Sequence, residues 1–173
     1  HQINDDTVIS NDDHTESLDD LLENHWWRDV LNAIRSNTLI TFSNLSCQLD
    51  LSKAENEVAF NIIDGSVHWA LCGSAWAHSS ISGGNSITTP RRLALESLAK
   101  LSIISANVDL ILATVSAERV KSMLRQLVKY LSRSEEEAIR ELAIVFLEKL
   151  AHSEFSIWEH VPDICKPIVS HLL

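Results

Sequence analysis

The sequence predicts an all-α fold, and three features of its composition support this. The 173 residues include only 4 Gly and 3 Pro, whereas 45% of them are hydrophobic. Sheets need frequent turns, which Gly and Pro supply, so a chain poor in both favours helices. A length of 173 residues fits one folded domain.

Charge divides the chain into two parts. Residues 1–27 hold eight acidic side chains and no Lys or Arg, whereas residues 28–173 hold the other 16 acidic side chains and all 14 basic ones. Acidic segments with few apolar residues bury too little surface to fold. We therefore expect a disordered acidic leader over 1–15 and a helical repeat domain over 16–173.

Five apolar residues at helical spacing form one stripe near the start of this domain: Trp26, Trp27, Val30, Leu31 and Ile34. A break at "RSN" (35–37) is expected to end this first helix. Residues 73–89 hold three of the four glycines and a run of serines, which predicts a loop. Pro90 then suits the first turn of a helix capped by Thr88 or Thr89. The predicted helices cover about 26–35, 38–49, 53–72, 90–104, 106–114, 117–131, 134–152 and 161–172.

Three segments share one apolar ladder: TLITFSNLS (38–46), ALESLAKLS (94–102) and AIVFLEKLA (143–151). Each has large apolar residues at i, i+3 and i+6, followed by a small residue. Armadillo and HEAT repeats have a period of roughly 40–47 residues. Loop 73–89 lies between the first two of the three segments and lengthens the distance between them along the chain. The ladder predicts an armadillo/HEAT-like right-handed α-solenoid of about three repeats; chance similarity among amphipathic helices is the alternative. The predicted core residues are Trp27, Leu31, Leu39, Phe42, Leu45, Leu95, Leu98, Leu101, Ile144, Leu147 and Leu150.

Four segments carry a resemblance to a known family: WWRDVLNAIRSNTLITFSNLSCQLDLS, IIDGSVHWALC, TPRRLALESLAKLSI and NVDLILAT. In this order they resemble the C-terminal armadillo-like region of the Osa-type ARID subunits of SWI/SNF (BAF-class) chromatin-remodelling complexes. The resemblance runs from about Trp26 to His152. Loop 73–89 diverges from the family, and SRSEEEAIREL is more acidic than its counterpart there.

The resemblance implies a function. It implies a non-catalytic, nuclear scaffold that binds other SWI/SNF subunits, including the ATPase and core scaffold subunits, and so supports ATP-dependent nucleosome remodelling and transcription regulation. It implies no cofactor, and contact with chromatin through the complex. The alternative is a generic armadillo-type adaptor that captures extended peptides. Such grooves present Trp and Asn four residues apart, whereas Trp69 is followed at that spacing by Gly73.

Two segments are candidate protein-binding sites. "LDDLL" places Leu18, Leu21 and Leu22 on one helical face, as in the LxxLL helices that nuclear receptors bind; the alternative is that these leucines begin the first scaffold helix. Trp76 and Ile81 are large apolar residues in a predicted loop, where binding to a partner would explain them.

Chemistry-bearing motifs are scarce. His68, Cys72 and His78 have spacing that a metal could use, but three ligands without a second cluster predict no metal site. We find no phosphate-binding glycine loop and no catalytic triad motif, and predict that the chain is not an enzyme.

Cysteine usage and hydropathy bear on the compartment. Cys47, Cys72 and Cys165 are widely spaced and odd in number, so we expect free, buried thiols in a reducing compartment. No apolar run is long enough for a bilayer, and the apolar pattern continues up to Leu173, as expected for a piece of a longer protein.

We predict that residues 26–173 do not bind duplex DNA tightly. DNA affinity requires clustered Lys and Arg that release counterions, whereas residues 28–173 carry a net charge of -2 with the two signs interspersed. A gel-shift titration at about 150 mM salt, where charges further apart than about 8 Å are largely screened, checks this. Submicromolar, salt-sensitive binding would contradict it.

Overall fold

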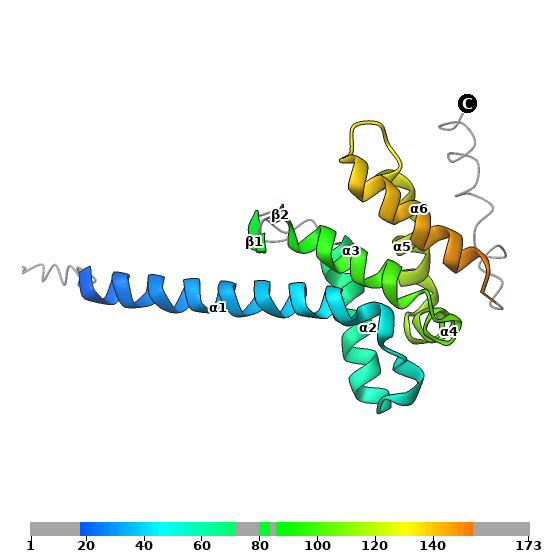
Figure 1. Cartoon of the computed structure of the whole chain (residues 1–173), viewed down its shortest axis with the longest axis horizontal. Helices are drawn as coiled ribbons and strands as arrows, with labels where there is room; N and C mark the ends of the chain where they lie inside the picture. The colour runs from blue at the N-terminus through cyan, green and yellow to red at the C-terminus, as the bar shows by residue number, and fades with distance from the viewer. Residues whose placement is uncertain (1–17, 72–79, 84–85, 154–173) are drawn as a thin grey trace, which may run out of the picture. The chain divides into compact units, whose positions relative to one another are not determined.

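The structure, a computed structural model, describes residues 18–71, 80–83 and 86–153 (Figure 1). Contacts divide the chain into two units, residues 1–34 and 35–173. In chain order the elements are α1 (Leu18–Leu45), the 3₁₀ helices η1 (Ser46–Gln48) and η2 (Leu51–Lys53), α2 (Asn56–Leu71), β1 (Ile81–Gly83), β2 (Ser86–Thr88), α3 (Pro90–Leu101), α4 (Ser105–Thr114), α5 (Ala117–Tyr130) and α6 (Glu137–Ala151).

The prediction of an all-α fold is confirmed, because helices supply all but one member of the buried core. The exception, Val115, directly follows α4. β1 and β2 form a short antiparallel hairpin with Ser82 opposite Ile87, inside the segment predicted as a loop. No helix among the described residues is both long and apolar enough to cross a membrane. The predicted leader 1–15 and helix 161–172 lie outside the described residues.

α1 is one continuous helix, so the predicted break at 35–37 is wrong. Arg35, Ser36 and Asn37 include no Pro or Gly, and Ser or Asn inside a helix costs only about 0.5 kcal/mol relative to Ala. This penalty is too small to end a helix that continues on both sides. The expected start of α3 is confirmed: Pro90 is its first residue, and the Arg92 N–H donates to Thr89 Oγ1 at 3.2 Å.

The core of the second unit is built around α3, which packs against α2, α6 and η1 (Figure 1). Leu95, Leu98 and Leu101 are fully buried, as predicted. Small residues let neighbours approach from other sides, since Ala94, Ser97, Ala99 and Ser102 are buried as well. Ser46, the small residue that ends the first ladder, is also fully buried. A central helix therefore combines a leucine stripe with small residues.

Four of the predicted core residues are exposed instead: Trp27, Leu31, Leu45 and Ile144. In α6 the buried stripe is Ile139, Ala143, Phe146 and Leu150, and Ile144 lies one residue, about 100°, away from it. The ladder thus has the wrong phase at Ile144, although Leu150 is buried as predicted. Leu39, Phe42 and Leu147 are partly buried. Cys47, predicted to be buried, is exposed.

The side chain of Asn107, in α4, is fully buried and joins three segments. Its Oδ1 accepts from the Leu51 N–H at 2.8 Å, and its Nδ2 donates to the carbonyls of Leu49 at 2.7 Å and Leu101 at 2.9 Å. These bonds connect α4 to the end of α3 and to the chain between η1 and η2. Because both amide hydrogens and the oxygen are used, the side chain satisfies three backbone groups in the interior.

We predict that Asn107→Ala lowers the free energy of unfolding by at least about 2 kcal/mol, because it leaves the Leu51 N–H and the Leu49 carbonyl without their partner, at about 1–3 kcal/mol each, whereas the Leu101 carbonyl still accepts from the Ile104 N–H. Urea denaturation measures the change. Asn61→Ala is the matched control, since Asn61 is exposed in α2 and surface changes stay within about 0.5 kcal/mol. Equal effects of the two substitutions would contradict this role of Asn107.

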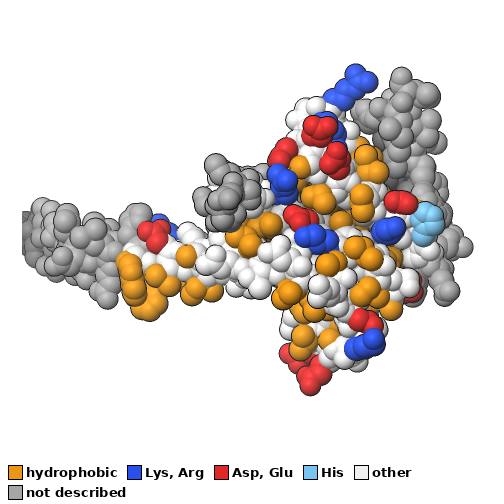
Figure 2. Space-filling model, viewed as in Figure 1, with side chains coloured by type: hydrophobic (Ala, Val, Ile, Leu, Met, Phe, Trp, Pro, Cys, Tyr) orange, Lys and Arg blue, Asp and Glu red, His pale blue; other side chains and the backbone are white. Residues whose placement is uncertain are grey.

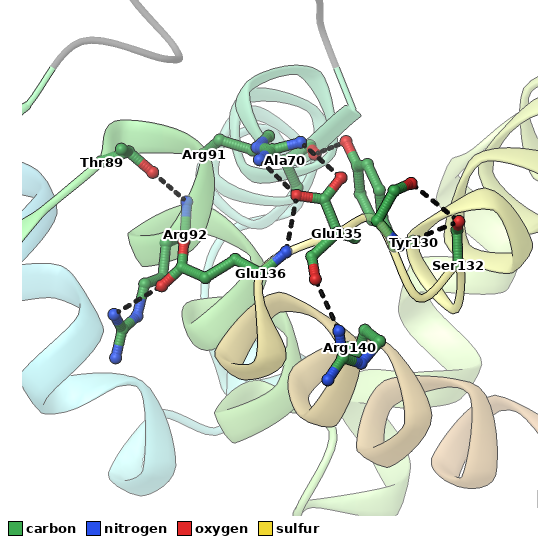
Figure 3. A network of polar contacts seen from close by, with 10 residues as sticks. Ala70, Thr89, Arg91, Arg92, Tyr130, Ser132, Glu135, Glu136 and Arg140 are labelled. Atoms are coloured by element: carbon green, nitrogen blue, oxygen red, sulfur yellow. Dashed lines mark hydrogen bonds and ion pairs between the residues drawn. The ribbon is translucent and has the colours of Figure 1, made fainter.

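A second polar connection links α3 to the turn between α5 and α6 (Figure 3). The Arg91 guanidinium donates to the two carboxylate oxygens of Glu135 at 2.9 and 3.3 Å and lies 5.2 Å from the centre of the Tyr130 ring. The Tyr130 hydroxyl donates to the Ala70 carbonyl at 2.7 Å, and Arg140 donates to the Glu135 carbonyl at 2.6 Å. We call the Arg91–Glu135 pair the clamp.

Electrostatics at the clamp favour the charged pair. Burial lowers the pKa of Arg91, but the hydrogen bonds and charge of Glu135, together with those of Tyr130, raise it by more, so the pKa of Arg91 stands above its ordinary value. Next to the clamp, Arg92 pairs with Glu136 at 3.1 Å between more exposed side chains. The two ion pairs connect the same elements and differ mainly in exposure.

A double-mutant cycle should separate the two pairs. The clamp side chains are only 14% and 22% exposed, so we expect an Arg91–Glu135 coupling of about 1.5–3 kcal/mol. Arg92 and Glu136 are 37% and 48% exposed, and solvent screening should reduce their coupling to below about 1 kcal/mol. Alanine substitutions and chemical denaturation measure both cycles, and an Arg92–Glu136 coupling as large as that of the clamp would refute the distinction.

Candidate protein-interaction surface

An apolar stripe on α1 is exposed in the described part of the first unit. Trp26, Trp27, Leu31 and Ile34 are 55%, 53%, 49% and 56% exposed. Their spacings of one, four and three residues place them on one side of the helix. Hydrophobic side chains gather on this helix in the space-filling view (Figure 2). We call these four residues the α1 stripe.

The α1 stripe contains a pair of aromatic rings in contact with each other. Trp26 and Trp27 meet edge to face, with ring centroids 4.7 Å apart and an interplanar angle of 64°. This geometry is favourable for aromatic pairs and restricts both side chains before any partner arrives. Arg28 and Asp29, which follow on the helix, are exposed polar residues outside the stripe.

A second exposed apolar site lies on α6. Ile144 and Val145 are exposed, and Glu141 and Glu148 are exposed on the same side of the helix. The large apolar side chains here are fewer than on α1, and carboxylates flank them. A small apolar site with charged neighbours is common on soluble proteins and is a weaker candidate for an interface than the α1 stripe.

A small cavity lies between α2 and α5. Its volume is about 190 Å³, and its lining residues are Val67, His68, Leu71, Arg119, Ser122 and Met123. Arg119 forms an ion pair with Asp64, which partly neutralises the positive charge of Arg119. Its lining combines apolar side chains (Val67, Leu71 and Met123) with polar ones (His68, Arg119 and Ser122).

The structure describes only some of the predicted binding residues. Leu18, Leu21 and Leu22 fall in the first two turns of α1, but their side chains lie outside what is described. Ile81 lies in β1 and is partly buried. Trp76 lies outside the described residues. The two predicted sites therefore stay predictions.

The candidate metal ligands are similarly incomplete. His68 is exposed on α2, with its ring edge to face against Trp69, and Cys72 and His78 lie outside the described residues. Over the described ranges, no group of three His, Cys, Asp or Glu side chains is placed to hold a metal ion. Trp69 is partly buried against the core.

Sequence reasoning identified the residues of the α1 stripe but assigned them to the wrong environment. Periodicity located one apolar face, and burial against the next repeat was assumed for Trp27 and Leu31. A stripe that packs inside the molecule and one that meets another protein have the same period. The cavity and the clamp were missed because they join residues 44 to 56 positions apart, for which the sequence holds no local signal.

Comparison with known proteins gives two findings. Residues 2–173 match the profile of the protein family described as SWI/SNF-like complex subunit BAF250/Osa. Over 153 residues the chain is 37% identical to the Trithorax group protein osa of Drosophila melanogaster. The matched segment covers 87% of this chain but only 6% of the Drosophila protein.

Proposed function

Because the chain belongs to the family of BAF250/Osa subunits of SWI/SNF-like complexes, we propose that it is a non-catalytic scaffold that holds subunits of such a complex together. Its role is to support ATP-dependent nucleosome remodelling and transcription regulation in the nucleus. Family membership itself confirms the resemblance noted in the sequence. The scaffold role is the further step, and the α1 stripe is the observation that carries it.

The α1 stripe supports a scaffold because exposed apolar surface of this kind is costly in water. Burying a large apolar side chain stabilises a protein by about 1.5–3 kcal/mol. Four such residues, each about half exposed, therefore leave a substantial part of this energy available to a partner. Interface hot spots are rich in Trp, and two adjacent tryptophans are well suited to anchor a partner subunit.

We extend the proposal to the architecture. An armadillo/HEAT-like solenoid would give the chain a series of stacked helices, each contacting its neighbours. The packing of α3 against α2 and α6 supports this arrangement, as does the small residue after two of the ladders, Ser46 and Ser102, both of which are buried. The right-handed course of a solenoid stays part of the proposal.

The expected partners are protein subunits. The ATPase and core scaffold subunits of the complex are proposed to bind the α1 stripe or Trp76 and Ile81 of the 73–89 segment, and chromatin is reached through the complex. Nuclear-receptor binding by Leu18, Leu21 and Leu22 stays a prediction. We do not propose the generic peptide adaptor, since the partly buried Trp69 is followed four residues later by Gly73 instead of Asn.

We predict that Trp26→Ala with Trp27→Ala weakens association with other subunits by at least about 2 kcal/mol, roughly thirtyfold, because truncated hot-spot residues lose this much. Alanine is the best helix former, so α1 itself should be retained. The measurement is affinity purification of the full-length protein carrying the two changes, with partner subunits quantified by mass spectrometry.

The matched control is Arg28→Ala with Asp29→Ala, which changes two adjacent exposed residues of the same helix and leaves the net charge unchanged. This control should retain the partner subunits at the level of the unchanged protein. If the tryptophan variant retains them equally well, the α1 stripe is not a subunit interface.

A further inference from the structure

The turn between α5 and α6 exposes a serine to solvent. Ser132, Arg133 and Ser134 are all exposed there. Ser134 Oγ lies 2.9 Å from Ser132 Oγ, and the Ser134 N–H donates to the same hydroxyl at 3.3 Å. Both of these bonds stay within the turn, so the Ser134 hydroxyl itself is not bonded to the helical core.

Ser134 is the one serine in the chain that is followed directly by three acidic residues, Glu135, Glu136 and Glu137. Glu136 pairs with Arg92 but is about half exposed, and Glu137 is exposed at the first position of α6. Two of the three carboxylates are therefore accessible from solvent. Kinases select substrates by such charge patterns.

We propose that Ser134 is a phosphorylation site for an acidophilic serine/threonine kinase. The Ser134 Oγ attacks the γ-phosphorus of magnesium ATP, so that an Oγ–P bond forms and the bond to the β–γ bridging oxygen breaks. ADP leaves, and the hydroxyl proton passes to the catalytic carboxylate of the kinase. The product carries about 1.5 to 2 additional negative charges at pH 7.

The start of α6 allows the turn to enter a kinase. A kinase binds its substrate as an extended segment, so the first turn of α6 must open briefly, and Glu135 and Glu136 must leave their ion pairs with Arg91 and Arg92. Glu136 is the N-cap of α6, and its side chain makes no capping hydrogen bond. An N-cap bond is typically worth about 1 kcal/mol, so a helix start without one opens more readily.

The surroundings of the turn suit a phosphate. Arg91, Arg92 and Arg140 bond to Glu135 or Glu136 around the turn (Figure 3), and Arg133 is exposed within it. These four arginines against the three glutamates leave a local charge of +1. Phosphorylation would reverse the sign of this local charge, and arginine is the side chain best suited to pair with phosphate.

Ser52 and Ser132 are poorer substrates for such a kinase, whereas two serines of the leader serve as controls. Ser132 is followed by Arg133, and the Ser52 hydroxyl already donates to Asp50 at 2.5 Å and is followed by Lys53. In the leader, Ser10 and Ser17 each have Asp at the second and third following positions. These two serines are internal positive controls for the activity of the kinase.

The test uses the full-length protein in its purified complex, incubated with an acidophilic serine/threonine kinase and magnesium ATP. Mass spectrometry of proteolytic peptides locates the phosphates. We expect phosphate on Ser134 as well as on the leader serines, its loss in Ser134→Ala and its retention in the matched variant Ser132→Ala. Glu136→Gln with Glu137→Gln should reduce the extent at Ser134 several-fold and leave Ser17 unchanged.

Two results would overturn the proposal. One is phosphate on Ser10 and Ser17 with none on Ser134, which would mean that the turn is closed to the kinase. The other is a phosphate in this turn that persists in Ser134→Ala and disappears in Ser132→Ala, which would assign the modification to the neighbouring serine.

Discussion

The packing of the second unit depends on the hydrogen bonds that the buried Asn107 side chain makes to backbone groups. η1 packs against α3 and η2 packs against α4, yet these single 3₁₀ turns and the two residues between them lack the regular α-helix that would pair their N–H and carbonyl groups. The buried amide of Asn107 bonds to the backbone of Leu49, Leu51 and Leu101 and so supplies hydrogen-bond partners that a regular helix would otherwise provide. Without these bonds, close packing would bury unpaired polar groups, which the hydrophobic contacts of one helix do not offset.

The position of α3 follows from this constraint and from its own sequence. Its leucines face the core while its alanines and serines let α2 and α6 approach. The clamp then holds the first turn of α3 to the α5–α6 turn through an ion pair that is largely shielded from solvent. Apolar packing thus determines which helices are neighbours, and the polar contacts determine how their ends meet.

The described residues thus include a buried core and, separately, exposed apolar and charged surfaces. The second unit places most of its large apolar side chains inside, whereas the α1 stripe in the first unit exposes four. The turn between α5 and α6 carries the opposite kind of surface, with arginines and glutamates arranged around the exposed Ser134. A scaffold subunit needs both: apolar sites for lasting contacts and charged sites where a contact can be changed.

The sequence by itself determined the fold class, the start of α3 at Pro90, and the burial of Leu95, Leu98, Leu101 and Leu150. These features depend on local propensity and helical period, which are properties of short segments. It did not determine whether Trp27, Leu31 or Ile144 would be buried, nor that α1 would continue through residues 35–37. Burial depends on which helix lies opposite a stripe. Only the tertiary structure decides this, through pairings such as Asn107 with Leu49 and Arg91 with Glu135, which are 58 and 44 residues apart and leave no periodic trace in the chain.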